Sequence, residues 1–173
     1  MKRTWAEVDF DKLAHNYHAL RGLAPAGTKY LGLVKADAYG HGAVPVAKKL
    51  EERGADYLGV ACLDEAIEVR EAGVKTPILI LGCTSSIYAA ELVKYNITQA
   101  CYDLEYAKEL SAGAQKAGGT ITVHIQCDTG MTRLGFMCHE DTMEKSASEI
   151  IEAVKLPGLK AEGIFTHFSD SDG

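Results

Sequence analysis

The chain has 173 residues, of which 47% are hydrophobic, and a chain of this size and composition can bury a substantial core. Its net charge of −6 argues against nucleic-acid binding, which typically needs a basic surface. No apolar run approaches the roughly 18 residues of a membrane-crossing helix, and the first residues lack the apolar stretch of a signal peptide. We therefore expect a globular cytoplasmic protein with neither a nucleic-acid nor a membrane partner.

Strand-like and helix-like segments alternate along the chain with short connections, a pattern typical of βαβ units and a parallel sheet. Segment 4–10 alternates loosely between apolar and polar residues, and the strand it predicts has no clear place in the sheet. A helix is expected over 11–23. The six segments that then predict strands are short, mostly apolar or β-branched, and bounded by Gly, Pro or polar residues: 28–35, 57–61, 77–82, 97–102, 120–127 and 162–167.

Three further helices follow from capping residues and apolar spacing. Asp64 is predicted to cap a helix that Gly73 closes, and Asp103 a helix that ends before Gly118. The segment after Asp141 has an apolar stripe that suits packing on a sheet. This stripe consists of Met143, Ala147, Ile150, Ile151 and Val154.

Six βα units in series are compatible with two folds, a doubly wound sheet and most of a (β/α)8 barrel. A complete barrel typically needs about 250 residues. We therefore expect either a fragment of a barrel or a sheet with an open edge.

In parallel α/β folds, ligands bind at the carboxyl ends of the strands. Lys35 follows the first strand, Arg133 the fifth, and His167 the sixth, which predicts that the three side chains converge on one face. Alternation places Lys35 on the same side as Leu31 and Leu33. If this side is the barrel interior, partial desolvation favours the neutral amine that Schiff-base chemistry requires.

Each of these residues also has an interpretation without a function. Lys35 could simply extend from the strand end into solvent. Arg133 could be a solvated loop arginine, and His167 a hydrogen-bonded histidine at a strand end. The residue types alone do not decide between the two interpretations.

The residues that follow Lys35 favour a phosphate ligand. Gly40 and Gly42 permit a tight turn at which the backbone can approach a phosphate, and Tyr39 can offer it a hydroxyl group. A dinucleotide-binding fingerprint is excluded because Pro45 replaces its third glycine.

The cysteines are five in number, form no C-x-x-C pair, and do not cluster with histidines as metal ligands do. We expect no metal site. The thiols are predicted to be reduced and to pack as small apolar side chains: Cys62, Cys83, Cys101, Cys127 and Cys138.

Three motifs and the opening segment carry a resemblance to a known family. VKADAYGHG at 34–42 is similar to the pyridoxal phosphate (PLP) lysine signature of bacterial alanine racemases. DTGMTRLGF at 128–136 and GIFTHF at 163–168 resemble two further segments of that family, and the opening WAEVDFDKLAHNY resembles its N-terminus. The order and spacing of these segments match over essentially the whole chain.

The resemblance implies an incomplete N-terminal PLP-binding (β/α)8 barrel over 11–173, and a strand over 1–10 that pairs with a C-terminal β-domain in relatives. It implies an amino-acid racemase that interconverts L- and D-alanine by a two-base mechanism, with pyridoxal 5'-phosphate as the electron sink. A small amino acid would be the substrate and a homodimer the full-length enzyme. Its product, D-alanine, would serve cell-wall peptidoglycan.

The resemblance also implies a role for individual residues. Lys35 matches the lysine that holds the cofactor and acts as one of the two bases, and Tyr39 matches the tyrosine that contacts the phosphate. Arg133 matches the arginine beside the cofactor ring oxygen and the substrate carboxylate, which a planar guanidinium suits. His167 matches the histidine that orients and polarises the second base. Lys35, Arg133 and His167 are thus the expected catalytic residues, and these three with Tyr39 the cofactor-binding residues.

The chain departs from the family pattern in three respects. Gln126 stands where many relatives carry a carbamylated lysine; its amide can hydrogen-bond Arg133 but cannot neutralise it, so we predict no carbamate. Asp37 replaces a more usual asparagine. The second base, a tyrosine of the other subunit's β-domain, and most phosphate ligands would lie beyond position 173, so the chain alone is expected to be inactive.

Four alternatives remain open. A racemase of the same family could act on serine, on a basic amino acid or on a broad range. A fold-type-III decarboxylase would share the barrel and the lysine but should lack the DTGMTRLGF segment. A single-barrel PLP homeostasis protein without racemase chemistry and a non-enzymatic binding module complete the set.

Overall fold

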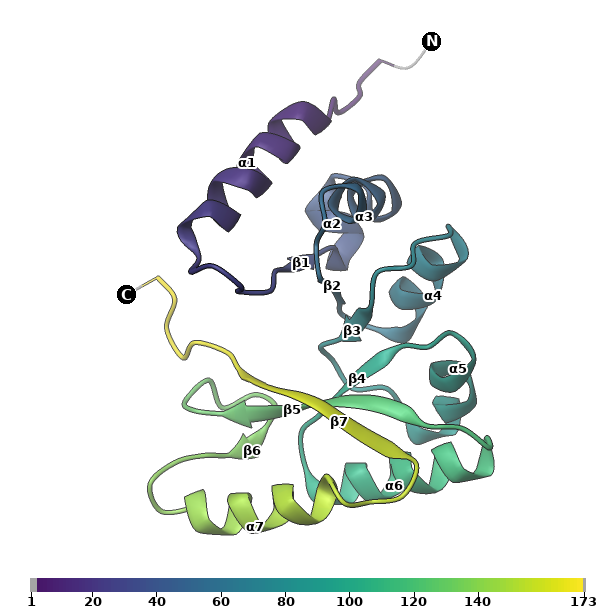
Figure 1. Cartoon of the computed structure of the whole chain (residues 1–173), viewed down its shortest axis with the longest axis vertical. Helices are drawn as coiled ribbons and strands as arrows, with labels where there is room; N and C mark the ends of the chain where they lie inside the picture. Colours follow the sequence, from purple (N-terminus) through teal and green to yellow (C-terminus); the bar gives the residue numbers. More distant parts are fainter. Residues whose placement is uncertain (1–2, 173) are drawn as a thin grey trace. The chain divides into compact units, whose positions relative to one another are not determined.

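The computed structural model describes residues 3–172, in which helices and parallel strands alternate (Figure 1). The chain divides into two compact units, Met1–Ile78 and Leu79–Gly173. We call them the first and the second unit and describe each by itself.

The first unit is built on two parallel strands. Gly32 lies opposite Leu58 in their register, and a Cβ on Gly32 would lie only 2.6 Å from Cδ1 of Leu50, so helix α3 packs directly on strand β1. The elements are α1 (Phe10–Leu23), β1 (Leu31–Leu33), α2 (Lys35–Gly40), α3 (Ala43–Glu52), β2 (Tyr57–Val60), α4 (Leu63–Glu71) and the start of β3 (Ile78–Ile80).

The second unit is centred on one long strand, β5. The elements that follow β3 are η1 (Ser86–Tyr88), α5 (Ala89–Lys94), β4 (Thr98–Cys101), α6 (Leu104–Lys116), β5 (Ile121–Asp128), β6 (Phe136–Met137), α7 (Met143–Ala153) and β7 (Leu159–Thr166). Strand β5 pairs in parallel with β4, β6 and β7, and the pairing with β7 shifts register between Val123 and His124.

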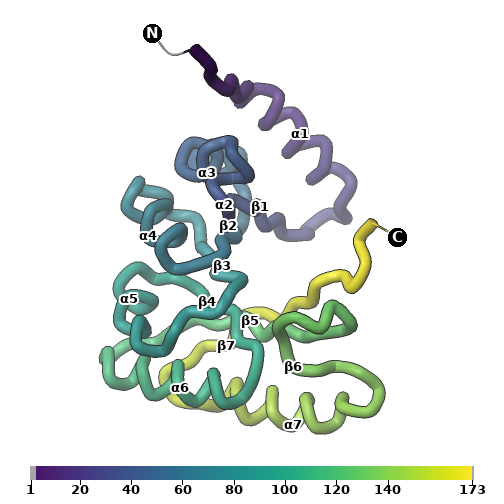
Figure 2. Tube along the Cα trace, turned by 180° about the vertical axis from the view of Figure 1, so that it is seen from behind, coloured from purple at the N-terminus to yellow at the C-terminus, as the bar shows by residue number. Residues whose placement is uncertain are grey.

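Helices α6 and α7 lie beside each other against these strands, and β7 runs alongside β5 in both views (Figures 1 and 2). Helix α6 buries Ala107, Leu110 and Ala114 completely. Burying a leucine side chain contributes about 1.5–3 kcal/mol. The predicted class, an α/β fold with parallel strands of an incomplete (β/α)8 barrel, is confirmed.

The six predicted strands are all present, although their ends differ from the predicted ones. Strand β1 ends at Leu33, so Lys35 lies in the following turn, and β7 starts earlier than predicted, at Leu159. Asp103 caps α6 as predicted, because its side chain accepts a hydrogen bond from the amide of Tyr106 at 2.7 Å. The cap predicted at Asp64 is wrong: α4 already begins at Leu63.

The segment expected as an opening strand forms no strand over residues 3–9. A strand needs a hydrogen-bonded neighbour, and no described strand pairs with this segment. Asp9 instead caps α1 by accepting hydrogen bonds from the amides of Asp11 and Lys12, both at 3.0 Å. Pairing with a β-domain in relatives remains a prediction.

All five cysteines are free thiols. Cys101 is buried, as expected of a packing residue, but Cys62 and Cys83 are exposed. The packing prediction is wrong for these two because they follow the ends of β2 and β3, where the chain emerges from the sheet. Within residues 3–172 we find no helix long and apolar enough to cross a membrane and no group of three potential metal ligands.

Candidate functional site

Residues 35–42, which we call the lysine turn, adopt an unusual backbone conformation. The four residues 36–39 all have φ between 51° and 55°, in the left-handed region, although none is a glycine. This conformation costs about 1–2 kcal/mol for each such residue. Gly40 and Gly42 also have positive φ, as predicted for a tight turn. The surroundings must therefore hold the turn in place.

Backbone and side-chain hydrogen bonds within the turn provide part of this support. The amide of Ala38 donates to the carbonyl oxygen of Val34 at 3.0 Å, and that of Gly42 to the carbonyl oxygen of Asp37 at 2.9 Å. Oδ1 of Asp37 accepts from the amide of Ala43 at 2.7 Å. Asp37 thus caps α3, whose N-cap residue, Gly42, has no side chain. An asparagine oxygen could accept the same bond, which explains why either residue suits this position.

A residue of another helix supplies further support. The Glu65 carboxylate in α4 accepts from the amide of Ala36 at 2.8 Å through Oε1 and from the amide of Ala61 at 2.7 Å through Oε2. Glu65 was not predicted from the sequence as a site residue. Its only signal was an acidic residue in the first turn of a helix, which is common at helix N-termini.

The turn presents an amine and a phenol at the surface of the first unit. Lys35 is half-buried, Tyr39 is 61% exposed, and Leu33 is 43% exposed, whereas Val34 on the other side of the strand is fully buried. A groove of about 470 Å³ lies beside the turn, between α1 and α3; Leu33, Tyr39 and His41 line it, but Lys35 does not.

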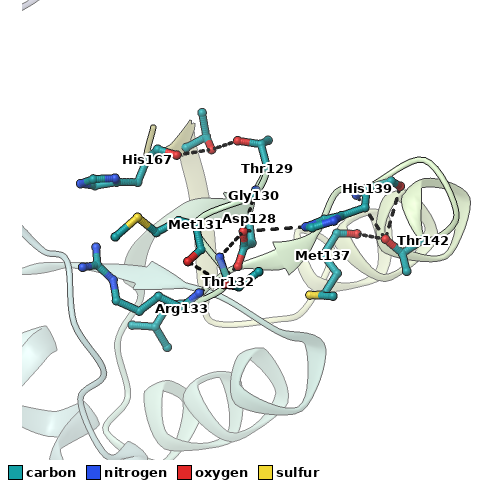
Figure 3. Close-up of polar contacts among 12 residues, drawn as sticks. Asp128, Thr129, Gly130, Met131, Thr132, Arg133, Met137, His139, Thr142 and His167 are labelled. Atoms are coloured by element: carbon teal, nitrogen blue, oxygen red, sulfur yellow. Dashed lines mark hydrogen bonds and ion pairs between the residues drawn. The ribbon is translucent and has the colours of Figure 1, made fainter. Parts of the chain in front are cut away.

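Residues 128–135, which we call the arginine loop, are organised by one carboxylate (Figure 3). Oδ1 of Asp128 accepts from the amides of Gly130 at 2.9 Å and Thr132 at 3.0 Å, and Oδ2 accepts from the amide of Arg133 at 3.0 Å. The hydrogen bonds from Gly130 and Thr132 are the main reason that the pKa of Asp128 lies below its ordinary value. The carboxylate is therefore ionised near neutral pH and holds the loop closed.

Gly135 ends this loop at a point of close backbone approach. Its φ is +135°, and a Cβ there would lie 2.5 Å from the amide nitrogen of Asp128 and 3.0 Å from the carbonyl oxygen of Gln126. Only glycine fits both the conformation and the space. The motif prediction contained this glycine but did not assign it a role.

Arg133 is exposed, and among the described residues its guanidinium group has no ion-pair partner. The side chains of Arg133, Met131 and His167 extend to the same side of the loop (Figure 3). A guanidinium group held in this way can bind a carboxylate or a phosphate through two parallel hydrogen bonds.

Gln126 does not form the hydrogen bond to Arg133 that its side chain could offer. Its Nε2 donates to the carbonyl oxygen of Leu134 at 3.0 Å, because the loop folds back over β5 at Gly135. Its buried Oε1 has no hydrogen-bond partner among the described residues.

His167 is exposed at the end of β7, and its Nδ1 lies 2.7 Å from the carbonyl oxygen of Phe168. A carbonyl oxygen only accepts, so Nδ1 carries the proton and Nε2 of the neutral ring is left as an acceptor. The hydroxyl groups of Thr129 and Thr166 lie 2.7 Å apart and tie the arginine loop to this end of β7.

His139 is a second residue of the site that was not predicted from the sequence. Its Nε2 lies 3.9 Å from Oδ1 of Asp128 (Figure 3). No motif signalled it, because it follows the two-residue strand β6, which was not predicted.

The candidate residues belong to two different units. Lys35 and Tyr39 lie in the first unit, and Arg133 and His167 lie in the second. The structure brings together the members of each pair within a unit, and the convergence of all of them on one face remains a prediction.

Comparisons of the sequence and of the structure with known proteins all find alanine racemases. Residues 8–173 match the family model described as alanine racemase, N-terminal domain. The chain is 45% identical over 172 residues to the alanine racemase of Clostridium perfringens, an alignment that covers 99% of this chain and 43% of that protein.

Solved structures show the same relationship. The alanine racemase of Clostridium difficile 630 is similar with a TM-score of 0.93 and 43% identity, over 100% of this chain and 44% of that one. The alanine racemase of Bacillus anthracis, solved with bound L-Ala-P, has a TM-score of 0.87 and 32% identity, over 97% of this chain and 42% of that one. The chain thus spans less than half the length of these relatives.

Proposed function

We propose that this chain, which belongs to the alanine racemase N-terminal domain family, forms the cofactor-binding part of a racemase that interconverts L- and D-alanine. The observation that carries the proposal is the lysine turn, which holds a costly backbone conformation directly after Lys35. Backbone strain of this kind persists where the surrounding structure enforces it, typically at functional sites.

The family depends on pyridoxal 5'-phosphate, and the residues of the lysine turn suit this cofactor. Lys35 offers an amine to its aldehyde, and the exposed Tyr39 offers a hydroxyl group to its phosphate. Gly40 and Gly42 have positive φ and no side chain to keep a ligand away from the backbone. When bound, the cofactor supplies an electron sink for a carbanion at the substrate α-carbon.

Each candidate residue then has a defined task. Lys35 holds the cofactor and moves a proton on one face of the substrate α-carbon. Arg133 binds the substrate carboxylate and orients the substrate, because its guanidinium group is exposed and its backbone is held by Asp128. His167 orients the second acid/base group through Nε2, since Nδ1 is bound to Phe168.

Inversion of an α-carbon needs an acid/base group on each face, and the residues assigned above supply only one. We therefore expect the 173-residue chain by itself to lack racemase activity. The whole protein would be a cytoplasmic homodimer acting on a small amino acid. The name alanine racemase, which the relatives share, supports the amino-acid substrate.

The test of cofactor binding is covalent trapping. The chain is incubated with pyridoxal phosphate, reduced with borohydride and digested, and the labelled peptide is identified by mass spectrometry. We expect the label at Lys35 and its loss in Lys35→Ala, whereas Lys116→Ala, which removes an exposed lysine at the end of α6, should leave it unchanged. An unlabelled wild-type chain would contradict the proposal, and racemisation by the chain alone would contradict the assignment of a single base.

A further inference from the structure

We propose that Glu65 is a positioning residue for Lys35: its carboxylate holds the lysine turn in the left-handed conformation that directs the amine to the cofactor. The inference rests on the proposed function for the identity of the cofactor. Its structural basis is independent of that assignment, because it lies in two hydrogen bonds and the backbone conformation of the turn.

Glu65 connects the ends of two neighbouring parallel strands. Ala36, whose amide binds Oε1, follows Lys35 directly after β1, and Ala61, whose amide binds Oε2, directly follows β2. The strand ends are already in register, since the amide of Val34 donates to the carbonyl oxygen of Gly59 at 2.8 Å. The carboxylate therefore fixes the first left-handed residue, Ala36, to a rigid sheet.

The chemistry of this position requires a carboxylate of this length. Both partners are N–H donors, so both side-chain oxygens must be acceptors. A glutamine keeps one acceptor and turns an NH2 group toward the other amide, which leaves a donor facing a donor. An aspartate keeps two acceptors but is one methylene shorter, so it does not reach both amides from the same helix position.

Loss of Glu65 should affect the turn more than the fold. The turn keeps its second tether, the bond from the Ala43 amide to Asp37, and its backbone bonds. However, the amide of Ala36, the first of the four left-handed residues, then loses the hydrogen bond to Glu65 that offsets the cost of its backbone conformation. A hydrogen bond to a charged acceptor is worth about tenfold or more in an equilibrium, so the left-handed turn should become correspondingly less populated.

The test combines two measurements on the 173-residue chain and its variants. One is hydrogen exchange at the amides of Ala36 and Ala61. The other is the pyridoxal phosphate concentration at which half of Lys35 is trapped by borohydride. For Glu65→Gln we expect exchange at Ala36 to be about tenfold faster and the half-saturation concentration to rise about tenfold. Glu65→Asp should show the same two changes as Glu65→Gln. Glutamine keeps the side-chain length and aspartate keeps the charge, so equal losses show that the position needs both.

Two further variants complete the design. Glu68→Gln, which changes an exposed glutamate of the same helix, should leave both measurements unchanged. Adding Ala36→Gly to Glu65→Gln should restore trapping at least in part, because glycine adopts positive φ without the cost. A residue that only supported the fold would not be rescued in this way.

The outcomes separate this inference from the proposed function. If Glu65→Gln is half-saturated at the same pyridoxal phosphate concentration as the wild type, the positioning role is overturned. If Glu65→Gln fails to fold, the double variant with Ala36→Gly decides, and an absence of rescue there overturns the role. If the wild-type chain takes up no label, the proposed function fails; faster exchange at Ala36 in Glu65→Gln then still supports a carboxylate-held turn, and unchanged exchange overturns it.

Discussion

The lysine turn and the arginine loop are both held by a carboxylate, but the carboxylate comes from a different place in each. Each places a cationic side chain just beyond the end of a parallel strand, and each is held by a carboxylate that accepts backbone amides. In the arginine loop, Asp128 binds three amides that all lie within five residues of it. In the lysine turn, Glu65 lies 29 residues from the amide of Ala36. The three amides that Asp128 binds all belong to the arginine loop, whereas the carboxylate that binds the amide of Ala36 comes from another helix.

The two regions also differ in how they reach positive φ. The arginine loop uses Gly130 and Gly135, and Thr132 is its only non-glycine residue with positive φ. The lysine turn uses four consecutive non-glycine residues. Because glycine adopts such angles freely and other residues do not, the turn carries more conformational cost and needs more tertiary support.

The largest expected effect comes from Gly135→Ala, which tests whether the loop depends on its glycine. The new Cβ would meet the backbone of Asp128 at 2.5 Å and force an unfavourable φ. We expect a loss of about 3 kcal/mol or more in the free energy of unfolding, measured by urea denaturation. The control is Gly118→Ala, which has a positive φ of 67° but open space and should cost about 1 kcal/mol. Equal losses in both variants would contradict the close-approach argument.

Exchanging each local aspartate for asparagine should separate the two regions. Asp128→Asn turns an NH2 group toward at least one backbone amide of the arginine loop, so we expect a loss of about 1–3 kcal/mol in unfolding free energy. Asp37→Asn keeps the one acceptor that caps α3 and should stay within about 0.5 kcal/mol of wild type. A comparable loss of unfolding free energy at both positions would contradict the idea that the number of amides bound by each aspartate sets its contribution to stability.

Acid should weaken the arginine loop through Asp128. The pKa of Asp128 is lowered in the folded state by hydrogen bonds from Gly130 and Thr132, so the unfolded chain binds its proton at higher pH than the folded one. The stabilisation is therefore complete above the ordinary pKa of 3.8 and is lost as the pH falls through the lowered value. The protection of the Thr132 amide against hydrogen exchange, taken relative to the intrinsic exchange rate at the same pH, should fall in this range. Asp128→Asn should remove that pH dependence, and its persistence would point to another group.

The smallest expected effect is a difference in the alkylation rates of two thiols, one near each region, measured in the unmutated chain. Burial, with a further contribution from the Cys138 thiol, raises the pKa of Cys127 at the base of the arginine loop to about 11 from an ordinary 9.0. Its thiolate fraction at neutral pH is thus about a hundredfold below that of an ordinary thiol. Cys62, beside the first turn of α4, is exposed. Brief alkylation with iodoacetamide, followed by peptide mapping, should label Cys62 long before the half-buried Cys127; the reverse order would contradict the raised pKa of Cys127.

Much of the fold follows from the sequence alone. The alternation of apolar segments and short connections predicted six parallel strands, and Asp103 was identified as a helix cap from its position. The three motifs identified the family that the comparisons then showed. These features depend on residues close together in the chain, as do the three amide hydrogen bonds through which Asp128 organises the arginine loop.

The tertiary structure decided the rest. Residues 36–39 carry no local signal for a left-handed conformation, since non-glycine residues disfavour it. Hydrogen bonds within the turn and at its end hold it in part, and the long-range hydrogen bond to Glu65 adds the contact from another helix. The cap at Asp64 was wrong because the start of a helix depends on where neighbouring elements lie. The pairing of the opening segment with a β-domain stays a prediction. The sequence determined which residues follow which strand, and long-range hydrogen bonds determined how the lysine turn presents Lys35.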